Sequence, residues 1–433
     1  SYSDLTRKTL VEVLKRQNPK RSKQESDHID KISNGAFTVT TGHQLMVCGG
    51  SAFFEVKIAS TIALAKTLSE ELQHPVIPIF WMASEDHDFE EIASFEINGQ
   101  IFTWKHEPLG GPVGRMLTKD LALQLEAFVA EVDLNDAQRA MLLSRVEAYK
   151  SESDLSSATR RIVREWAKDL GILVLDGDDV QLKECSSHLW DKELLGELGK
   201  EIKSQTIKLQ DAGYKAQVFP REVNLFSLEN DTRTRIETLN HSVSPVNISP
   251  NALVRPIFQE YVLPNLAYIG GGGELAYWLQ LSSTFEMLEI TMPLLYLRDS
   301  LLCIPQKIDR KVRQENRTWA EVMNSSKESM LKDNLGYYST LSQETTDLSK
   351  PLLSAIDEWN RSLIALYPEM QQHASALQHK IKKISDKTIE QRFRITKRRA
   401  EEDVKRIDEI YDHMNPSGVF WERKSSYLDA IGI

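Results

Sequence analysis

Residues 265–297 read NLAYIGGGGELAYWLQLSSTFEMLEITMPLLYL, and this stretch decides the fold. It predicts a strand at residues 265–269, a turn at 270–273, a helix at 274–288 and a second strand at 292–297. A helix that connects two strands joins them as parallel members of one sheet. The stretch therefore indicates a βαβ unit, from which parallel α/β folds are built.

The earlier part of the chain repeats this alternation of strand and helix. Residues 36–40 (AFTVT) are of β-forming types, and residues 53–72 carry apolar side chains at helical spacing. Residues 75–83 (PVIPIFWMA) are almost all apolar, as in a strand buried on both faces of a parallel sheet, and residues 172–176 (ILVLD) resemble them. We predict an α/β fold with an open, mostly parallel sheet, whose ligands bind at the carboxyl ends of the strands.

The composition changes after Pro305. Between Pro305 and Pro416 the chain holds a single glycine and two prolines, which predicts helices. Pro368 fits the first turn of a further helix. Apolar residues recur four and three positions apart, as in a coiled coil or a helical hairpin within one chain: Leu352, Ile356, Trp359, Leu363, Leu366 and Met370.

Length, charge and cysteine content set further bounds. The 433 residues exceed one ordinary domain, and we expect an α/β core with connecting insertions at 1–305, a helical coiled-coil domain at 306–415, and a segment at 416–433 that packs back on the core. The net charge of −10 disfavours a general nucleic-acid binder. Three widely spaced cysteines argue against a disulfide framework, and no signal-like or membrane-length apolar run occurs, so we expect a cytoplasmic protein.

Five acids and one histidine crowd residues 84–91 (SEDHDFEE), directly after the apolar strand. Such charges repel unless a cation, a substrate amine or altered protonation relieves them, which indicates a functional site. Asp86 or His87 could be the general base that deprotonates an ammonium nucleophile. We also place Glu85 in the catalytic group and Asp88 in contact with substrate. The alternative is a capped helix N-terminus that acids stabilise.

The predicted turn at residues 41–44 (TGHQ) is a second candidate, because a strand followed by a helix can present N–H groups to an anion. His43 could donate to a phosphate or to a developing oxyanion, Gln44 could contact substrate, and Gly42 could border a cofactor. The alternative is ordinary turn chemistry. Lys57, farther along an apolar stretch, could simply extend its stem to water.

The third candidate is the glycine run before Glu274, where a ligand could approach the backbone closely: Gly270, Gly271, Gly272 and Gly273. Glu274 could bind an amine or a hydroxyl, or could only stabilise the start of a helix. Tyr277 could contact substrate. The run is neither GxGxxG nor a Walker motif, which disfavours a dehydrogenase or a P-loop NTPase.

Four arginines are candidate clamps for an acidic substrate, because a guanidinium group pairs with a carboxylate through two hydrogen bonds: Arg115, Arg221, Arg255 and Arg298. Structural salt bridges to Glu222, Glu260 or Asp299 are an equal alternative. The sequence contains no HExxH, no GxSxG and no Cys/His pair at metal-binding spacing, so we predict no metal site.

Five long motifs stand out in the chain: TGHQLMVCGG (41–50), FWMASEDHDFEEI (80–92), GGPVGRM (110–116), QVFPREVNLF (217–226) and LVRPIFQEYVLPNLAYIGGGGELAYWLQL (253–281). Together they resemble the cysteine-adding enzymes of bacillithiol biosynthesis, the BshC family. The chain departs from the pattern of that family at residues 47–53 (VCGGSAF), with Gly49 in place of a threonine and Ser51 in place of a proline.

This resemblance implies a Rossmann-like core with connecting insertions and a helical coiled coil that pairs two subunits. It also implies a ligase that joins the carboxyl group of cysteine to the amine of glucosaminyl-malate, with the three candidate motifs around one pocket. Amide formation in water needs an activated acyl group, so ATP or a related nucleotide, with magnesium, is a candidate cofactor. The alternatives are a nucleotidyltransferase-like enzyme acting on another small acid, and a helical scaffold with a vestigial core.

Overall fold

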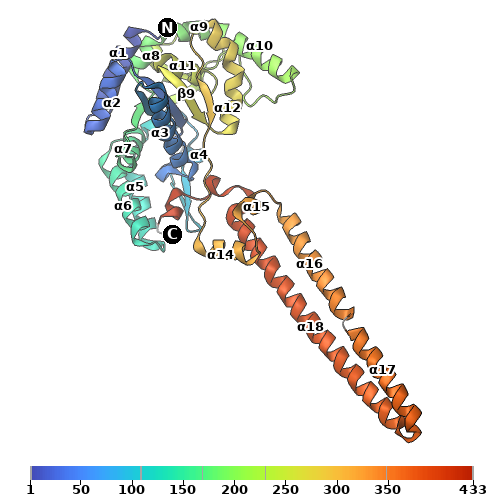
Figure 1. Ribbon diagram of the computed structural model, residues 1–433. Coiled ribbons are helices and arrows are strands. Elements are labelled where there is room, and N and C mark those ends of the chain that lie inside the picture. The colour runs from blue at the N-terminus through green and yellow to red at the C-terminus, as the bar shows by residue number, and fades with distance from the viewer. Residues whose placement is uncertain (1, 108–109, 168, 230, 348, 432–433) are drawn as a thin grey trace. The chain divides into compact units, whose positions relative to one another are not determined.

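The chain divides into two compact units. The first unit runs to Leu301 and includes the C-terminal segment from Glu422, and the second unit comprises residues 302–421 (Figure 1). The computed structural model describes residues 2–107, 110–167, 169–229, 231–347 and 349–431.

A five-stranded sheet forms the centre of the first unit, in the order β10-β9-β1-β2-β5, and all of its pairings are parallel. The strand order runs outward in two directions from β1, which is where ligands bind in open α/β sheets. This confirms the predicted Rossmann-like fold. The strands are β1 (Phe37–His43), β2 (Val76–Met82), β5 (Leu173–Asp176), β9 (Asn265–Gly270) and β10 (Leu294–Leu297).

Strand β2 shows why its sequence is apolar at every position. Phe80 and Met82 belong to the hydrophobic core on one face of the sheet. Ile77, Ile79 and Trp81 belong to the core on the other face, and the whole strand is buried. A strand covered on both sides has no solvent face, so the alternation of apolar and polar residues disappears.

Helices cover the sheet, and two small antiparallel sheets are inserted between them (Figure 1). The helices are α1 (Asp4–Gln17), α2 (Lys23–Ser33), α3 (Phe53–Leu72), α4 (Phe89–Ile92), α5 (Lys119–Glu131), α6 (Asp136–Ser151), α7 (Leu155–Trp166), α8 (Val180–Cys185), α9 (Ser187–Leu194), α10 (Glu197–Asp211), α11 (Val254–Val262), α12 (Gly272–Trp278) and α13 (Ser282–Met287). The inserted strands are β3 (Ser94–Ile97) with β4 (Gln100–Thr103), and β6 (Leu225–Glu229) with β7 (Thr232–Arg235) and β8 (Ile248–Pro250).

Two predicted local structures differ from the observed ones. The prediction of a turn at residues 41–44 is wrong for the first three residues, because β1 lies between β2 and β9 and continues to His43. Helix α3 begins only at Phe53, so no helix starts directly after His43. The helix predicted at residues 274–288 is divided into α12 and α13 by the 3-10 turn Leu279–Leu281.

The C-terminal segment makes polar contacts inside the first unit. Glu422 forms a buried ion pair with Arg298, at 2.7 Å, and accepts the N–H of Leu301. Asp429 accepts the N–H of Asn98, at 2.7 Å. These contacts tie the end of the chain to residues that follow β10 and to the hairpin of β3 and β4.

The second unit is helical. In it α18 (Gln371–Met414) runs antiparallel to α16 (Lys327–Asp347) and α17 (Ser349–Leu366) (Figure 1). Pro368 opens a 3-10 turn, Pro368–Met370, directly before α18, as its position predicted. Two shorter helices, α14 (Gln306–Gln314) and α15 (Trp319–Met323), share a core with α18. Among the described residues no helix is both long and apolar enough to cross a membrane.

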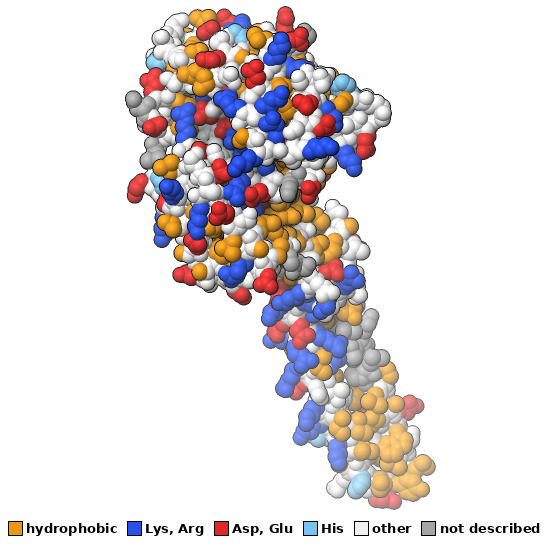
Figure 2. All heavy atoms as spheres, turned by 90° about the vertical axis from the view of Figure 1, so that its left-hand side faces the viewer, with side chains coloured by type: hydrophobic (Ala, Val, Ile, Leu, Met, Phe, Trp, Pro, Cys, Tyr) orange, Lys and Arg blue, Asp and Glu red, His pale blue; other side chains and the backbone are white. Residues whose placement is uncertain are grey.

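The hairpin of α17 and α18 covers only part of the predicted apolar stripe. Ile356 and Leu363 are partly buried, whereas Leu352, Trp359 and Leu366 have exposed fractions of 54%, 53% and 75%. Figure 2 shows hydrophobic side chains gathered towards the far end of this hairpin. Exposed apolar surface of this kind is typical of interaction sites.

Candidate active site

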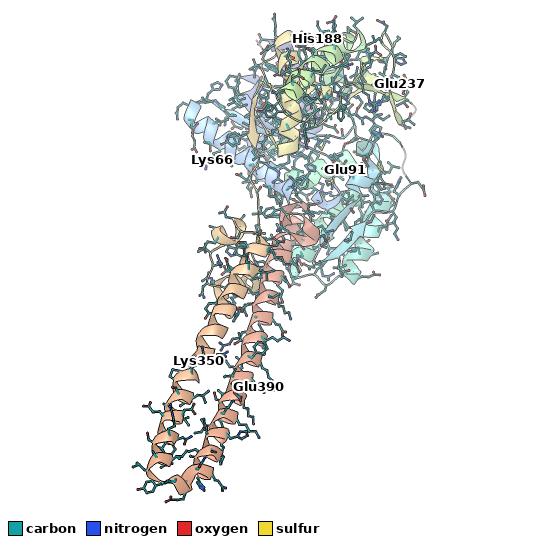
Figure 3. The ribbon with its side chains drawn as sticks, turned by 90° about the vertical axis from the view of Figure 1, so that its right-hand side faces the viewer. Lys66, Glu91, His188, Glu237, Lys350 and Glu390 are labelled. Atoms are coloured by element: carbon teal, nitrogen blue, oxygen red, sulfur yellow. The ribbon has the colours of Figure 1, made fainter. Side chains whose placement is uncertain are left out.

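A cavity of about 600 Å³ lies at the carboxyl ends of β1 and β2, where the direction of the strand order changes. Glu91, labelled in Figure 3, is on its wall. The cavity also takes residues from the sheet of β6, β7 and β8 and from α3, α11 and α12. Its lining comprises Gly42, His43, Gln44, Met46, Phe53, Lys57, Trp81, Met82, Ala83, Glu85, Asp86, Glu91, Phe226, Arg233, Pro250, Asn251, Ala252, Arg255, Glu274 and Tyr277.

His43 ends β1 and packs its ring against Phe53 and Phe54. Its Nδ1 lies 3.0 Å from the carbonyl oxygen of Gln44, and since a carbonyl only accepts, Nδ1 carries the hydrogen. Burial, with the charge of Lys57, lowers the pKa of His43 to about 4, so the ring is neutral. Nε2 therefore presents a lone pair. This geometry favours an acceptor over the donor that the sequence led us to expect.

Lys57 does not extend to solvent, as its place in the sequence allowed, because it is 3% exposed. Its Nζ donates to the carbonyl oxygen of Gly42, at 2.6 Å, and pairs with Glu274, at 2.7 Å. Burial opposes ionisation of Glu274, but Lys57 and the hydroxyl of Tyr268 outweigh it and lower the pKa of Glu274 to about 2. Glu274 is thus an ionised carboxylate committed to internal partners.

Asp86 is held at the cavity by three donors. Gln44 Nε2 donates to its Oδ2, at 2.8 Å, the His87 N–H donates to its Oδ1, and the Arg233 guanidinium lies 3.4 Å away. Partial burial raises the pKa of Asp86, yet these partners reverse the effect and hold that pKa below its usual value. Gln44 also donates to Glu91, at 2.8 Å.

His87 does not line this cavity, and its lone pair is already engaged. Arg233 Nη1 donates to His87 Nδ1 over 2.9 Å. Since arginine has only donors, Nδ1 is the acceptor, and a proton taken from substrate would have to displace this contact. The structure therefore gives less support to His87 as a base than the sequence did. Asp88 instead caps α4 by accepting the N–H of Glu91.

Glu85 also lines the cavity and lies next to a buried lysine. Lys183, on α8, pairs with Glu85 at 2.6 Å and with Asp178 at 2.7 Å. Burial raises the pKa of Glu85 to about 6, against the attraction of Lys183. Arg115 binds the same Asp178 through two hydrogen bonds, at 2.8 and 3.0 Å, and does not line the cavity.

The remaining arginines divide between the cavity and structural roles. Arg255 lines the cavity, donating to Gln259 at 2.9 Å and to the Tyr277 hydroxyl at 3.3 Å. Arg298 is occupied by Glu422, and Arg221 is exposed; neither lines the cavity. For Arg298 the salt-bridge alternative holds, with a partner that the sequence did not suggest.

The glycine positions have unequal roles. A Cβ at Gly42 would come within 3.3 Å of Arg255 Nη1 and of the Tyr268 hydroxyl, so close packing inside the protein already accounts for this glycine. A Cβ at Gly270 would come within 2.9 Å of Leu275. The other glycines of the run, Gly271, Gly272 and Gly273, have open space there, and none of the four lines the cavity.

The structure thus brings eight sequence-predicted residues to one cavity: Gly42, His43, Gln44, Glu85, Asp86, Arg255, Glu274 and Tyr277. Sequence reasoning missed Arg233, Phe226 and Trp81 as part of the cavity wall, included Glu91 in the acidic cluster without giving it a role, and misjudged Lys57. The position of Lys57 within a long apolar stretch was the signal that could have indicated its burial. Among the described residues no group of three or more His, Cys, Asp or Glu side chains could hold a metal ion.

Comparison with known proteins gives a consistent result. Residues 1–299 match the family model described as bacillithiol biosynthesis BshC, N-terminal Rossmann-like domain. A protein of Flavobacterium psychrophilum named "Putative cysteine ligase BshC" is 33% identical over 98% of this chain and 84% of its own length. A protein of the same name from Christiangramia forsetii is 31% identical, covering 99% of this chain and 85% of that protein.

Proposed function

The chain belongs to the BshC family of bacillithiol biosynthesis, and from this premise we propose that it joins the carboxyl carbon of cysteine to the amine of glucosaminyl-malate in the cavity at the ends of β1 and β2. The relatives carry the name of a cysteine ligase, so the enzyme class is ligase. The amide bond forms when the neutral amine attacks the carbonyl carbon of an activated cysteinyl group. The bond from that carbon to the activating group breaks, the activating group leaves with the electron pair, and the new amide nitrogen loses one proton.

The observation that carries this proposal is the opposite behaviour of two adjacent carboxyl groups. The pKa of Asp86 is held below its usual value, while burial raises the pKa of Glu85 to about 6. Neighbouring acids with divergent pKa values are suited to different roles. Asp86, always ionised near neutral pH, binds the substrate ammonium. Glu85, whose pKa of about 6 leaves it mainly ionised at neutral pH, accepts the proton that the substrate ammonium must lose before its nitrogen can attack.

The cationic wall of the cavity suits the malate part of the acceptor. Arg255 has guanidinium hydrogens beyond those used by Gln259 and Tyr277, and it lines the cavity. Arg233 is more fully committed, since it also donates to Ser249 and to the Pro250 carbonyl. Arg255 is therefore our choice for a substrate carboxylate, through charge-assisted hydrogen bonds.

His43 completes the arrangement from the β1 side. Its free Nε2 lone pair can accept a hydrogen bond from a substrate ammonium or hydroxyl. The buried pair of Lys57 and Glu274 supports this wall, because Lys57 holds the Gly42 carbonyl directly before His43. We assign Lys57 and Glu274 a positioning role.

A mass-spectrometric assay of purified protein with cysteine and glucosaminyl-malate tests the activity, and it is run with and without ATP and magnesium. Product only with ATP would establish a ligase that uses a nucleotide-activated acyl group. Product without ATP would mean that the energy for amide formation comes from a source other than ATP. No product from folded protein with either mixture, or with pre-activated cysteine esters, would overturn the proposed reaction.

We propose further that the enzyme is a homodimer, in which α17 of each subunit contributes to a helical interface. The support is the exposed apolar row formed by Leu352, Trp359 and Leu366, together with the family resemblance. Complete burial of a large apolar side chain contributes about 1.5–3 kcal/mol, and these three side chains are half or more exposed, so burying them from both subunits would contribute favourably to association.

A cytoplasmic location completes the proposal. The substrate cysteine and the product both depend on a free thiol, and thiols persist in reducing compartments. Fractionation of the native host should recover the protein with cytoplasmic markers; recovery with the membrane or the medium would contradict this location.

A further inference from the structure

A second cavity, of about 900 Å³, lies in the first unit between the connection of α1 to α2 and the helix α7. It shares no lining residue with the candidate active site. Figure 2 faces this side of the molecule and shows many Lys and Arg side chains on it. The lining comprises Arg16, Gln17, Pro19, Lys20, Arg21, Ser22, Glu25, Glu152, Ser157, Arg160, Arg161, Arg164 and Glu165.

The lining is strongly cationic in a chain whose net charge is −10. Six lysine and arginine residues face three glutamates there. Part of this charge is used internally: Arg164 holds Glu25 through two hydrogen bonds, at 2.6 and 2.9 Å, and Arg161 pairs with Glu165 at 2.7 Å. Those pairs fix the walls. The lining holds more lysine and arginine residues than glutamates, and this excess of positive charge gives the cavity a positive electrostatic potential.

Arg160 is a largely buried residue of the lining with an incomplete set of partners. Its side chain is 14% exposed, and the one ion pair found for it among the described residues, to Asp176, is long, at 3.8 Å. Its buried Nε has no hydrogen-bond partner among the described residues. A buried guanidinium group without its full set of acceptors is costly, and an anion in the cavity beside it would supply them.

We propose that this cavity binds a small polyanion that carries phosphate groups, with Arg160 as the central ligand and with Lys20 and Arg21 at the sides. Arginine and lysine converging on one cavity match the charge of a di- or triphosphate better than that of a single carboxylate. The hydroxyls of Ser22 and Ser157 add neutral donors. None of the described lining residues is aromatic, so the cavity recognises the phosphate groups and offers no platform for a base.

The second cavity is joined to the first by one side-chain path. Arg160 contacts Asp176 at the end of β5, and Asp176 accepts a hydrogen bond from the Ser84 hydroxyl. Ser84 directly precedes Glu85 and Asp86, which line the candidate active site. An anion that draws Arg160 away from Asp176 would therefore alter the support of that loop.

Isothermal titration with inorganic pyrophosphate tests the binding site without reference to ligation. The wild-type chain should bind pyrophosphate, and Arg160→Met should weaken binding by about tenfold or more, as expected for the loss of charge-assisted hydrogen bonds. The double variant K20Q/R21Q changes only side chains at the edge of the cavity. It should also weaken the binding of pyrophosphate, so the proposal can still be tested if Arg160→Met does not fold. Arg255→Met, in the first cavity, is the matched control and should bind as the wild type does.

Three results would overturn the proposal. One is no binding of pyrophosphate by the wild type. The second is that K20Q/R21Q and a folded Arg160→Met variant both bind pyrophosphate as tightly as the wild type does. This includes the case in which Arg255→Met alone loses pyrophosphate binding, which would place the ligand in the first cavity. The third is citrate binding at least as tightly as pyrophosphate, which would remove the phosphate class.

Discussion

Lys57 Nζ lies 2.7 Å from Glu274 Oε2, although 217 positions separate the two residues in the chain. The contact joins α3, which follows β1, to α12, which follows β9. These are the elements on the two sides of the switch in strand order. An ion pair at this point holds together the two halves of the candidate active site. Because its two charges are opposite, the pair adds no net charge to the cavity wall.

The first prediction concerns the stability that depends on this pair. Lys57→Met should lower the free energy of unfolding by about 3 kcal/mol, because it leaves the carboxylate of Glu274 enclosed without its cation. K57M/E274Q should recover part of this loss, since neither charge then remains unpaired. Urea denaturation of the three chains measures both effects. Equal stability of Lys57→Met and the wild type would show that the pair contributes nothing.

The second prediction concerns the acid limit of stability. The folded-state pKa of Glu274, about 2, lies below the ordinary value of 4.5, so its contribution to stability is present above pH 4.5 and is lost as the pH falls towards 2. In the wild type the free energy of unfolding should therefore fall over this interval. Glu274→Gln should show a shallower slope there. Melting temperatures of the wild type and of Glu274→Gln, measured between pH 5 and pH 2.5, check this. If both fall with pH at the same slope, the lowered pKa of Glu274 is contradicted.

A third prediction follows from the role given to Glu85. The value of kcat/KM should rise with pH through about 6, because Glu85 must be ionised to accept the amine proton. Glu85→Gln should remove this limb and reduce the rate by about 100-fold. Initial rates between pH 5 and pH 8 measure the profile. Persistence of the limb in Glu85→Gln would assign it to another group.

The fourth prediction separates Asp86 from its acidic neighbour. Asp86→Asn should lower kcat/KM by about 10- to 100-fold, through loss of a charge-assisted contact with the substrate ammonium. Asp88→Asn is the matched control, because Asp88 caps the four-residue helix α4 and does not line the first cavity. It should retain activity within about threefold. Similar losses in both variants, at equal melting temperature, would refute a specific role for Asp86.

The fold was predictable because the burial of a position largely determines which residue types occupy it. The apolar run of β2 is found as a buried strand, as the sequence indicates. The strand and the helix on either side of the glycine run are also found, but the predicted turn at 270–273 is too long, because Gly270 ends β9 and α12 begins at Gly272. Likewise, Pro368 marks the start of a helix through its own geometry.

The candidate site was predictable only where its residues stand in motifs. Arg233 comes from β7 of an inserted sheet, and nothing in the stretch TRTR signals that its guanidinium reaches Asp86. The burial of Lys57 depends on a partner 217 positions away. The hydrogen-bonding role of His43 depends on which carbonyl its Nδ1 meets, a matter of tertiary geometry.

The last prediction concerns assembly. The triple variant Leu352→Gln, Trp359→Gln, Leu366→Gln should elute as a monomer in gel filtration with light scattering, whereas the wild type should be a dimer. The substitutions remove apolar surface from exposed positions of α17, so the fold of each chain should persist. A control triple variant at three exposed leucines of the first unit, Leu5→Gln, Leu117→Gln, Leu123→Gln, should stay dimeric. A wild-type chain that is monomeric at every concentration would exclude the dimer, and dissociation in both triple variants would remove α17 as its specific interface.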